Sequence, residues 1–269
     1  MLTKTPFDIL AKTYDQNFVQ SRTGQLQREK VWHYFTPFLN GRNRPLRILE
    51  INCGTGEDAI RLAQMGHQVI GTDASSSMIE ISEQKAERLK MDNVQFMQCS
   101  FNEISSYFSK QKFDLVFSNF AGINCANHHE IVQLGKDFYS LLRPDGNLFL
   151  VALSRFCLWE LFYYTAKIKP GIAFRRLKKN NSFIVGGHSM PVYYYSPAGL
   201  KKLFSPYFEQ DQAYPVGLFL PPTYLETSFL KYPSWLDKLN RWEYGPGKHS
   251  LFSSLADHFC IILKKHSGI

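Results

Sequence analysis

Short apolar runs alternate with amphipathic stretches over the first half of the chain. The apolar runs predict five strands, at residues 47–52, 68–72, 94–98, 113–118 and 147–153. Between them, apolar residues recur every three or four positions, which predicts helices over 58–65, 77–90 and 130–142. Strands that alternate with helices at this spacing indicate an α/β fold with a mostly parallel sheet and helices on both faces.

Other segments flank this predicted core of residues 46–154. Residues 1–45 are expected to form a helical lead-in, since apolar residues from Phe7 to Phe18 keep helical spacing, and a second helix is expected over Leu26–Leu39. Residues 155–195 are interpreted as a cover insertion, with an extended pair around Gly186 and Gly187. Residues 196–269 are expected to complete a doubly wound, Rossmann-like sheet of seven strands, and they contain an aromatic, Pro-rich insertion at about 217–250.

The charge is unevenly distributed along the chain. The 269 residues carry a net charge of +8, yet residues 1–154 contain 16 Lys/Arg and 16 Asp/Glu, against 15 and 7 in residues 155–269. A basic, aromatic C-terminal part suits an acidic or amphipathic partner, and it equally suits a solvated basic surface over an aromatic core. Both interpretations stay open at this point.

The cysteines and the apolar runs bear on the cellular compartment. The five cysteines form no CxxC pair, and the N-terminus has no apolar signal region, so we expect a cytoplasmic protein with reduced thiols. The longest uncharged run, residues 180–200, is interrupted by glycines and prolines and cannot form a spanning helix. We therefore expect no transmembrane segment.

A glycine turn follows the first predicted strand, in the segment EINCGTGEDAIRLAQMGHQVIGTD from Glu50 to Asp73. Gly54 and Gly56 allow the backbone to approach a ligand closely. Asp73 ends the second strand 17 residues past Gly56, near the ~20 expected of a nucleoside-binding unit, where a carboxylate accepts ribose hydroxyls.

The residues around this turn indicate whether it suits a dinucleotide or S-adenosylmethionine. Glu57 and Asp58 stand where a pyrophosphate would bind, and two carboxylates there would repel it. S-adenosylmethionine has no phosphate, and Glu50 suits its ammonium group. The segment therefore favours S-adenosylmethionine over NAD.

Five motifs in order now define a resemblance. They are ILEINCGTG (48–56), VIGTDASSSM (69–78), VQFMQCSFNEI (94–104), FDLVFSNFA (113–121) and LLRPDGNLFLV (141–151). Over these roughly 100 residues the chain resembles the class I S-adenosylmethionine-dependent methyltransferase family. The FDxxAxxYD pattern from Phe7 to Asp15 is similar to members that act on small molecules, and the resemblance weakens after Ser154.

The resemblance implies S-adenosylmethionine as cofactor, with S-adenosylhomocysteine as product. It implies roles for Glu50 at the amino acid moiety, Asp73 at the ribose and Asn119 with Phe120 at the methyl end. The other implied cofactor-binding residues are Tyr14, Asn52, Cys53, Gly54, Gly56, Ala74, Met78, Ser100 and Phe101. Asn52 replaces the family's usual first glycine, and Ser100 replaces a frequent Asp. A plain packing role is the favoured interpretation of the Cys53 thiol.

The catalytic residues are less defined by the sequence. His128, His129 and His188 are candidate general bases, together with the hydroxyls of Tyr193–Tyr195. The alternatives are helix capping or solvent exposure for the histidines and packing for the tyrosines. His/Cys/Asp residues show no metal-ligand spacing, so we expect no metal.

The sequence thus predicts a methyltransferase for a small apolar, aromatic or acidic metabolite. The alternatives are an RNA or protein methyltransferase that uses the basic C-terminal part, and a non-catalytic S-adenosylmethionine-binding protein. Nucleic acid is the less expected partner, because the chain lacks an NPPY-type motif after the fourth strand and a separate RNA-binding module. Segment 156–174 is interpreted as a substrate lid, a packed helix or a peripheral membrane contact. The oligomeric state is not predicted.

Overall fold

A seven-stranded sheet forms the centre of the molecule in the computed structural model, which describes residues 5–178, 181–185, 187–229, 233–245 and 249–267. The strand order is β3-β2-β1-β4-β5-β9-β8. The strands are β1 (Arg47–Ile51), β2 (Gln68–Asp73), β3 (Val94–Gln98), β4 (Phe113–Ser118), β5 (Leu142–Leu153), β8 (Phe208–Val216) and β9 (His258–Lys265). Only β9 of these seven runs antiparallel to its neighbours. The predicted Rossmann-like, mostly parallel sheet is confirmed.

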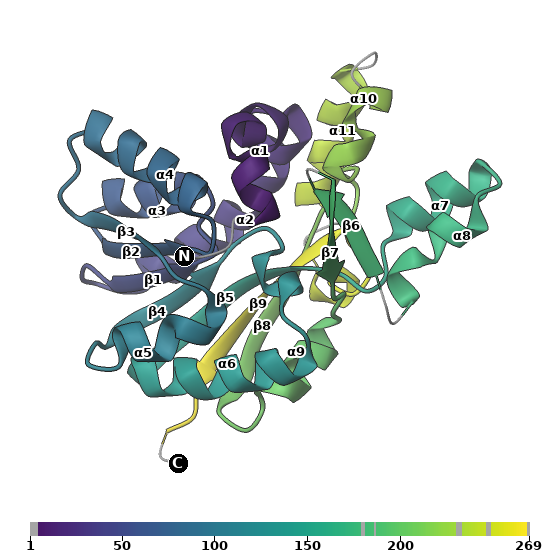
Figure 1. Ribbon diagram of the computed structural model, residues 1–269. Helices are drawn as coiled ribbons and strands as arrows, with labels where there is room; N and C mark the ends of the chain where they lie inside the picture. Colours follow the sequence, from purple (N-terminus) through teal and green to yellow (C-terminus); the bar gives the residue numbers. More distant parts are fainter. Residues whose placement is uncertain (1–4, 179–180, 186, 230–232, 246–248, 268–269) are drawn as a thin grey trace.

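Helices cover both faces of this sheet (Figure 1). One face carries α2 (Arg22–Asn40), α3 (Glu57–Gln64) and α4 (Ser76–Arg88), and the other carries α5 (Ile104–Phe108), α6 (His128–Leu141) and α9 (Pro197–Phe204). Their apolar stripes face the sheet. For example, the Phe35 ring of α2 lies 4.5 Å from Phe117 and 4.4 Å from Phe149, between ring centroids. This packing fixes the strand ends that carry the motifs.

Local signals at helix ends act as the sequence predicts. The Ser75 hydroxyl accepts a hydrogen bond from the Met78 backbone N–H (3.2 Å) at the start of α4, and Ser196 accepts one from Gly199 (3.0 Å) at the start of α9. Gly66 ends α3 with φ +90°, a left-handed conformation that favours glycine. These residues bound the loops on either side of β2 and the loop between β7 and α9.

Two element boundaries differ from the sequence prediction. The second helix starts at Arg22 rather than Leu26, because the Ser21 hydroxyl caps it by accepting from the Gly24 N–H (3.1 Å). Residues 143–146, predicted as a turn, lie within β5, whose pairing with β4 shifts register between Phe113 and Leu115. A bulge of this kind absorbs extra residues without ending the strand.

The N-terminal helix α1 (Pro6–Tyr14) is attached to the core through the start of α4. The Asp8 carboxylate accepts hydrogen bonds from the Ser75 hydroxyl (2.6 Å) and the Ser77 N–H (3.0 Å). A single π-helical turn, Asp15–Val19, then leads toward α2. The helical lead-in therefore lies against the element that follows Asp73.

The C-terminal part adds elements beyond the sheet. They are α7 (Leu158–Ala166), α8 (Pro170–Ala173), the hairpin of β6 (Asn181–Val185) and β7 (His188–Val192), α10 (Glu226–Phe229) and α11 (Pro233–Tyr244). The predicted extended pair is thus a hairpin, with Gly187 at φ +83°, whereas Gly186 lies outside the described residues. In Figure 1, α7 and α8 stand apart from the sheet, beyond this hairpin. Among the described residues, the helices are all too short or too polar to cross a bilayer.

Candidate cofactor and acceptor site

The glycine turn after β1 has the close backbone packing that the sequence predicts. Gly54 and Gly56 have φ of +54° and +82°. A Cβ atom at Gly56 would lie 2.7 Å from the Ser82 Cβ and 2.8 Å from the Phe96 ring, so a larger residue does not fit there. The turn is therefore held open by glycine at the carboxyl end of the sheet.

Asp73 faces this turn from the end of β2. Its carboxylate accepts hydrogen bonds from the backbone N–H groups of Gly54 (3.0 Å) and Ser75 (2.9 Å). Burial raises the pKa of Asp73, although these two hydrogen bonds act in the opposite direction. The carboxylate is fixed in orientation and keeps lone pairs for further donors, as a ribose-binding residue requires.

Glu50 is a buried carboxylate with one unpartnered oxygen. The residue is 2% exposed, and its Oε2 atom has no hydrogen-bond partner among the described residues. Burial, and then the neighbouring Asp58 charge, raise the pKa of Glu50 well above its usual value. A buried, unpaired carboxylate oxygen is unfavourable unless a donor joins it, and a cationic ligand would be such a donor.

Arg28 of α2 brings a buried positive charge beside Glu50, which the sequence analysis did not single out. Its guanidinium forms an ion pair with Asp58, which also accepts hydrogen bonds from the Trp32 indole (2.8 Å) and the Asn119 amide (2.8 Å). Its Nε atom is buried without a partner. Because Arg28 occupies one position of an ordinary amphipathic helix, nothing local in the sequence distinguishes it.

The loop after β4 has unusual backbone geometry. Phe120 and Ala121 have φ of +44° and +67°, and Asn52 on the facing loop has +51°. The Asn52 amide donates to the Asn119 carbonyl (3.1 Å) and accepts from the Ser118 hydroxyl (2.8 Å). Asn tolerates positive φ better than most residues, so Asn52 can adopt this conformation. Its side chain also joins the two loops, which a glycine could not do. Strained backbone held this firmly is typical of ligand-binding sites.

Tyr14 at the end of α1 lies against the glycine turn. Its ring carbon Cε1 is 3.7 Å from the position a Cβ would take on Gly54. Nearby, the Thr55 hydroxyl donates to Asp15 (2.5 Å), which holds the end of α1 to the turn. Burial raises the pKa of Tyr14, so its hydroxyl is protonated at neutral pH. Tyr14 therefore lies beside the glycine turn, and its contact with the cofactor stays a prediction.

The other cofactor-site candidates lie along β2, β3 and the turn. The Ser100 hydroxyl donates to Glu103 (2.6 Å), which lowers the pKa of that carboxyl, and Phe101 follows it in a short helical turn. Ala74 is exposed, whereas Met78 is buried in the first turn of α4. Cys53 is buried, and burial raises the pKa of its thiol well above the usual value, which favours the packing interpretation. The cofactor roles of these residues stay predictions.

The three predicted histidines lie in exposed positions. His128 and His129 occupy the first turn of α6, where the Asn127 side chain accepts from the His129 N–H (2.9 Å). The His128 ring centroid is 5.6 Å from that of Tyr195, and the Tyr195 hydroxyl donates to the Ala126 carbonyl (2.5 Å). His188 starts β7 and is exposed. Their catalytic roles stay predictions.

A fourth histidine, His258, lies closer to the loop after β4. It starts β9 opposite Leu153, and its ring meets Phe120 edge-on, with 5.6 Å between centroids. Its Nδ1 atom is 3.2 Å from the Asp257 carboxylate without meeting hydrogen-bond geometry, and its side chain is 10% exposed. Arg28 also contacts Phe120, and its guanidinium carbon lies 4.9 Å from the Phe120 ring centroid. The sequence analysis missed His258 because its neighbours in space come from distant segments.

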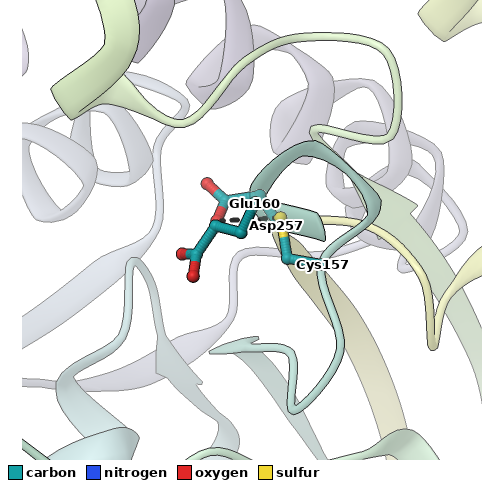
Figure 2. A group of neighbouring side chains, drawn as sticks. All are labelled: Cys157, Glu160 and Asp257. Carbon is teal, nitrogen blue, oxygen red and sulfur yellow. Dashed lines mark hydrogen bonds between the residues drawn. The ribbon is translucent and has the colours of Figure 1, made fainter. Parts of the chain in front are cut away.

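Three buried side chains, Cys157, Glu160 and Asp257, have ligand atoms within 4.8 Å of one another (Figure 2). The two carboxylates already pair with guanidinium groups, at 2.8 Å for Arg175 to Glu160 and 2.5 Å for Arg176 to Asp257. Burial opposes ionisation of Glu160, yet the two arginines lower its pKa below the usual value. Burial raises the pKa of the Cys157 thiol to about 12, which disfavours the thiolate. The group is therefore an ion-pair cluster rather than a metal centre.

Comparison with known proteins identifies the same region. Residues 48–146 match a family model described as a methyltransferase domain. The tRNA 5-carboxymethoxyuridine methyltransferase of Escherichia coli (strain K12) is 31% identical over 147 residues, 54% of this chain and 55% of that protein. A demethylmenaquinone methyltransferase of Bacteroides fragilis is 27% identical over 184 residues, 65% and 71% of the two chains.

A solved structure matches more of the chain at lower identity. The CcbJ methyltransferase from Streptomyces caelestis has a TM-score of 0.62 and 16% identity, over 97% of this chain and 98% of that one. At this identity the likeness concerns the fold alone. By sequence, the chain spans about half the length of the E. coli relative that it matches.

Proposed function

Because this chain belongs to the class I S-adenosylmethionine-dependent methyltransferase family, we propose that it transfers a methyl group from that cofactor to a small acceptor. The acceptor would be an apolar, aromatic or acidic metabolite. One observation carries the proposal: the unpartnered Glu50 carboxylate oxygen, the buried Arg28 guanidinium and the oriented Asp73 carboxylate share one edge of the sheet.

The charges of these three residues fit the cofactor. Glu50 would accept the ammonium group, and Arg28, whose Nε lacks a partner, would bind the carboxylate of the same amino acid moiety. Asp73 would accept the ribose hydroxyls.

Methyl transfer at this site needs alignment more than covalent help from the protein. When bound, S-adenosylmethionine supplies a methyl group on a positively charged sulfur. Holding the acceptor in line with it contributes roughly 7–11 kcal/mol to lowering the barrier. Asn119 and Phe120, fixed by the loop geometry after β4, would line this side of the site.

An acceptor that loses a proton would need a base, and His258 is positioned for that role. Asp257 contacts its Nδ1 atom, and Arg176 in turn holds Asp257 at 2.5 Å. A general base at this position would contribute roughly 10²–10⁴-fold. His128, His129 and His188 remain alternative candidates on the exposed side of the loops.

The cover supports a small rather than a macromolecular acceptor. The Asn124 side chain donates to the carbonyls of Tyr193 (2.6 Å) and Leu153 (3.2 Å), and the Arg155 N–H donates to Tyr195 (2.7 Å). These bonds hold the segment after β7 against the loops that follow β4 and β5. A segment attached there restricts access from the acceptor side.

A second candidate acceptor is tRNA. The E. coli relative is named for a tRNA substrate, and the net charge of +8 would favour binding to a polyanion. In this alternative the basic C-terminal part would bind phosphates.

Radiolabelled S-adenosylmethionine distinguishes the two acceptors. We expect label in the organic-extractable or small-molecule fraction of a metabolite extract incubated with the protein, and none in purified tRNA. Asp73→Ala protein serves as the matched blank. Label in tRNA alone would reject the small-acceptor proposal, and label in neither fraction would favour a non-catalytic binding protein.

A further inference from the structure

The helices α7 and α8 form an arm with a fixed root and an exposed end. At the root, Glu160 accepts hydrogen bonds from Arg175 (2.9 and 2.8 Å), Arg176 (2.8 Å) and the Tyr224 hydroxyl (2.7 Å). Arg176 continues this network to the Asp257 carboxylate on the sheet side. Residues 165–172, by contrast, are all exposed. In Figure 1 the arm extends away from the sheet, so its end meets solvent.

Large apolar side chains gather on this arm and are not used by the core. They are Phe162, Ile168, Ile172, Phe174 and Leu177. We define the first three as the apolar tip, because Phe174 and Leu177 flank Arg175 and Arg176 at the root. Ile168 is 88% exposed and Phe162 is 68% exposed. Single exposed apolar residues are ordinary, but several together on one projecting element indicate an interaction site.

Ile168 is the most exposed of the five, and its backbone is unfavourable for its side chain. It follows α7 with φ +56°, a left-handed conformation that a β-branched residue rarely adopts. Its N–H donates to the Thr165 carbonyl (2.9 Å), and the Lys169 N–H donates to Tyr164 (2.8 Å), so the chain is held in this turn. Neither packing nor backbone preference explains an isoleucine here, whereas contact with an apolar partner would.

The positive charge of the arm indicates the class of partner that it would bind. No Asp or Glu occurs in the sequence between Glu160 and Glu209, whereas eight Lys and Arg do. Glu160 itself is buried and paired with two arginines. Lys167 and Lys169 flank Ile168 and are exposed. The partner therefore combines an apolar interior with a negatively charged surface.

We propose that the α7–α8 arm docks on an anionic lipid bilayer. The apolar tip would enter the boundary between headgroups and acyl chains, and Lys167 with Lys169 would bind the headgroups. Nucleic acid fits less well, because bases stack on aromatic rings and the most exposed tip residue, Ile168, is aliphatic. The proposal concerns binding and does not depend on the acceptor.

Vesicle flotation of the full chain tests this surface. We expect the protein to float with vesicles of phosphatidylcholine and phosphatidylglycerol and not with phosphatidylcholine alone. Ile168→Asp should reduce the bound fraction at least about tenfold, since it places a charge at the insertion point. Lys167→Gln with Lys169→Gln should reduce affinity by about fivefold per lysine.

Leu251→Asp is the matched control, because Leu251 is 86% exposed and lies outside the arm. It should float as the wild type does. The proposal is overturned if the wild type fails to float with anionic vesicles, or if Ile168→Asp and Leu251→Asp float equally. Binding of a fluorescent RNA that is lost in the double lysine variant, without flotation of the wild type, would overturn it in favour of a nucleic-acid surface.

Discussion

Glu50 is a residue whose charge conflicts with its surroundings in the absence of a ligand. The pKa of Glu50 is raised in the folded state. The folded protein therefore loses stability as the pH rises above the usual carboxyl pKa, because ionisation of Glu50 then favours the unfolded chain. We therefore expect Glu50→Gln to raise the melting temperature of the ligand-free protein at neutral pH. The shift should be about 2–4 °C for each kcal/mol gained.

The same substitution should weaken S-adenosylmethionine binding, because the amide cannot pair with an ammonium. Thermal unfolding from pH 8 to about pH 4, where carboxyls protonate in unfolded chains, checks the assignment. The gain should disappear at the acidic end, since both proteins are then uncharged at this position. Glu209→Gln, at an exposed site on β8, should change neither property. A stabilised variant that binds the cofactor as well as the wild type would remove Glu50 from the site.

At this scale, sequence reasoning succeeded where a residue's environment is local. Gly54 and Asp73 lie in one strand–turn–strand unit, and the Asp73 carboxylate accepts a hydrogen bond from the Gly54 N–H within it. Arg28 was missed because its partner Asp58 lies 30 residues away on another helix. His258 was missed for the same reason, since Phe120 belongs to the loop after β4, a segment distant in sequence from β9.

At the scale of elements, the ion-pair cluster at the root of the arm joins α7 to the start of β9. Replacing Glu160 by Gln leaves Arg175 and Arg176 with less compensation in a buried site. We expect this variant to lose about 3–5 kcal/mol of unfolding free energy at neutral pH, the effect of removing one partner of a buried pair. Chemical denaturation measures it.

An exposed pair provides the control for this prediction. Asp237→Asn removes the partner of Arg22, in a pair whose side chains are 61% and 55% exposed, and should change stability by less than about 1 kcal/mol. The pKa of Glu160 is lowered in the folded state, so the stability from the cluster is present above the usual carboxyl pKa and is lost in acid. The difference between the wild type and Glu160→Gln should shrink as the pH falls. Equal losses in the two variants would show that the cluster is not a stabilising joint.

Element boundaries show what local patterns can and cannot predict. The apolar runs at 94–98 and 113–118 match β3 and β4 residue for residue. Their signals are local, because burial alternates along β3, and β4 is buried throughout. The extended pair in the segment 155–195 was predicted and is the β6–β7 hairpin, yet the attachment of this segment was not predicted. That attachment rests on Arg176 and Asp257, 81 residues apart, and no periodicity connects such a pair.

For the whole molecule, the proposed cofactor site and the proposed docking arm lie in different parts of the chain. The sheet edge brings Glu50, Asp73 and the loop after β4 together, and the arm carries apolar and basic residues away from the sheet (Figure 1). The uneven charge of the sequence corresponds to this division, with the excess in residues 155–269. A bilayer-bound arm would also place the site near apolar acceptors.

The central claim is that the edge of β1 and β2 binds S-adenosylmethionine. Isothermal titration of the full chain tests it most directly, with Asp73→Ala and, as control, Asp211→Ala at an exposed position on β8. We expect binding by the wild type and by Asp211→Ala, and at least about a tenfold loss in Asp73→Ala, because charge-assisted hydrogen bonds contribute about 1.5–3 kcal/mol each. A circular dichroism melt verifies that each variant is folded. Absence of binding by the wild type, or an unchanged affinity in folded Asp73→Ala, would contradict the account.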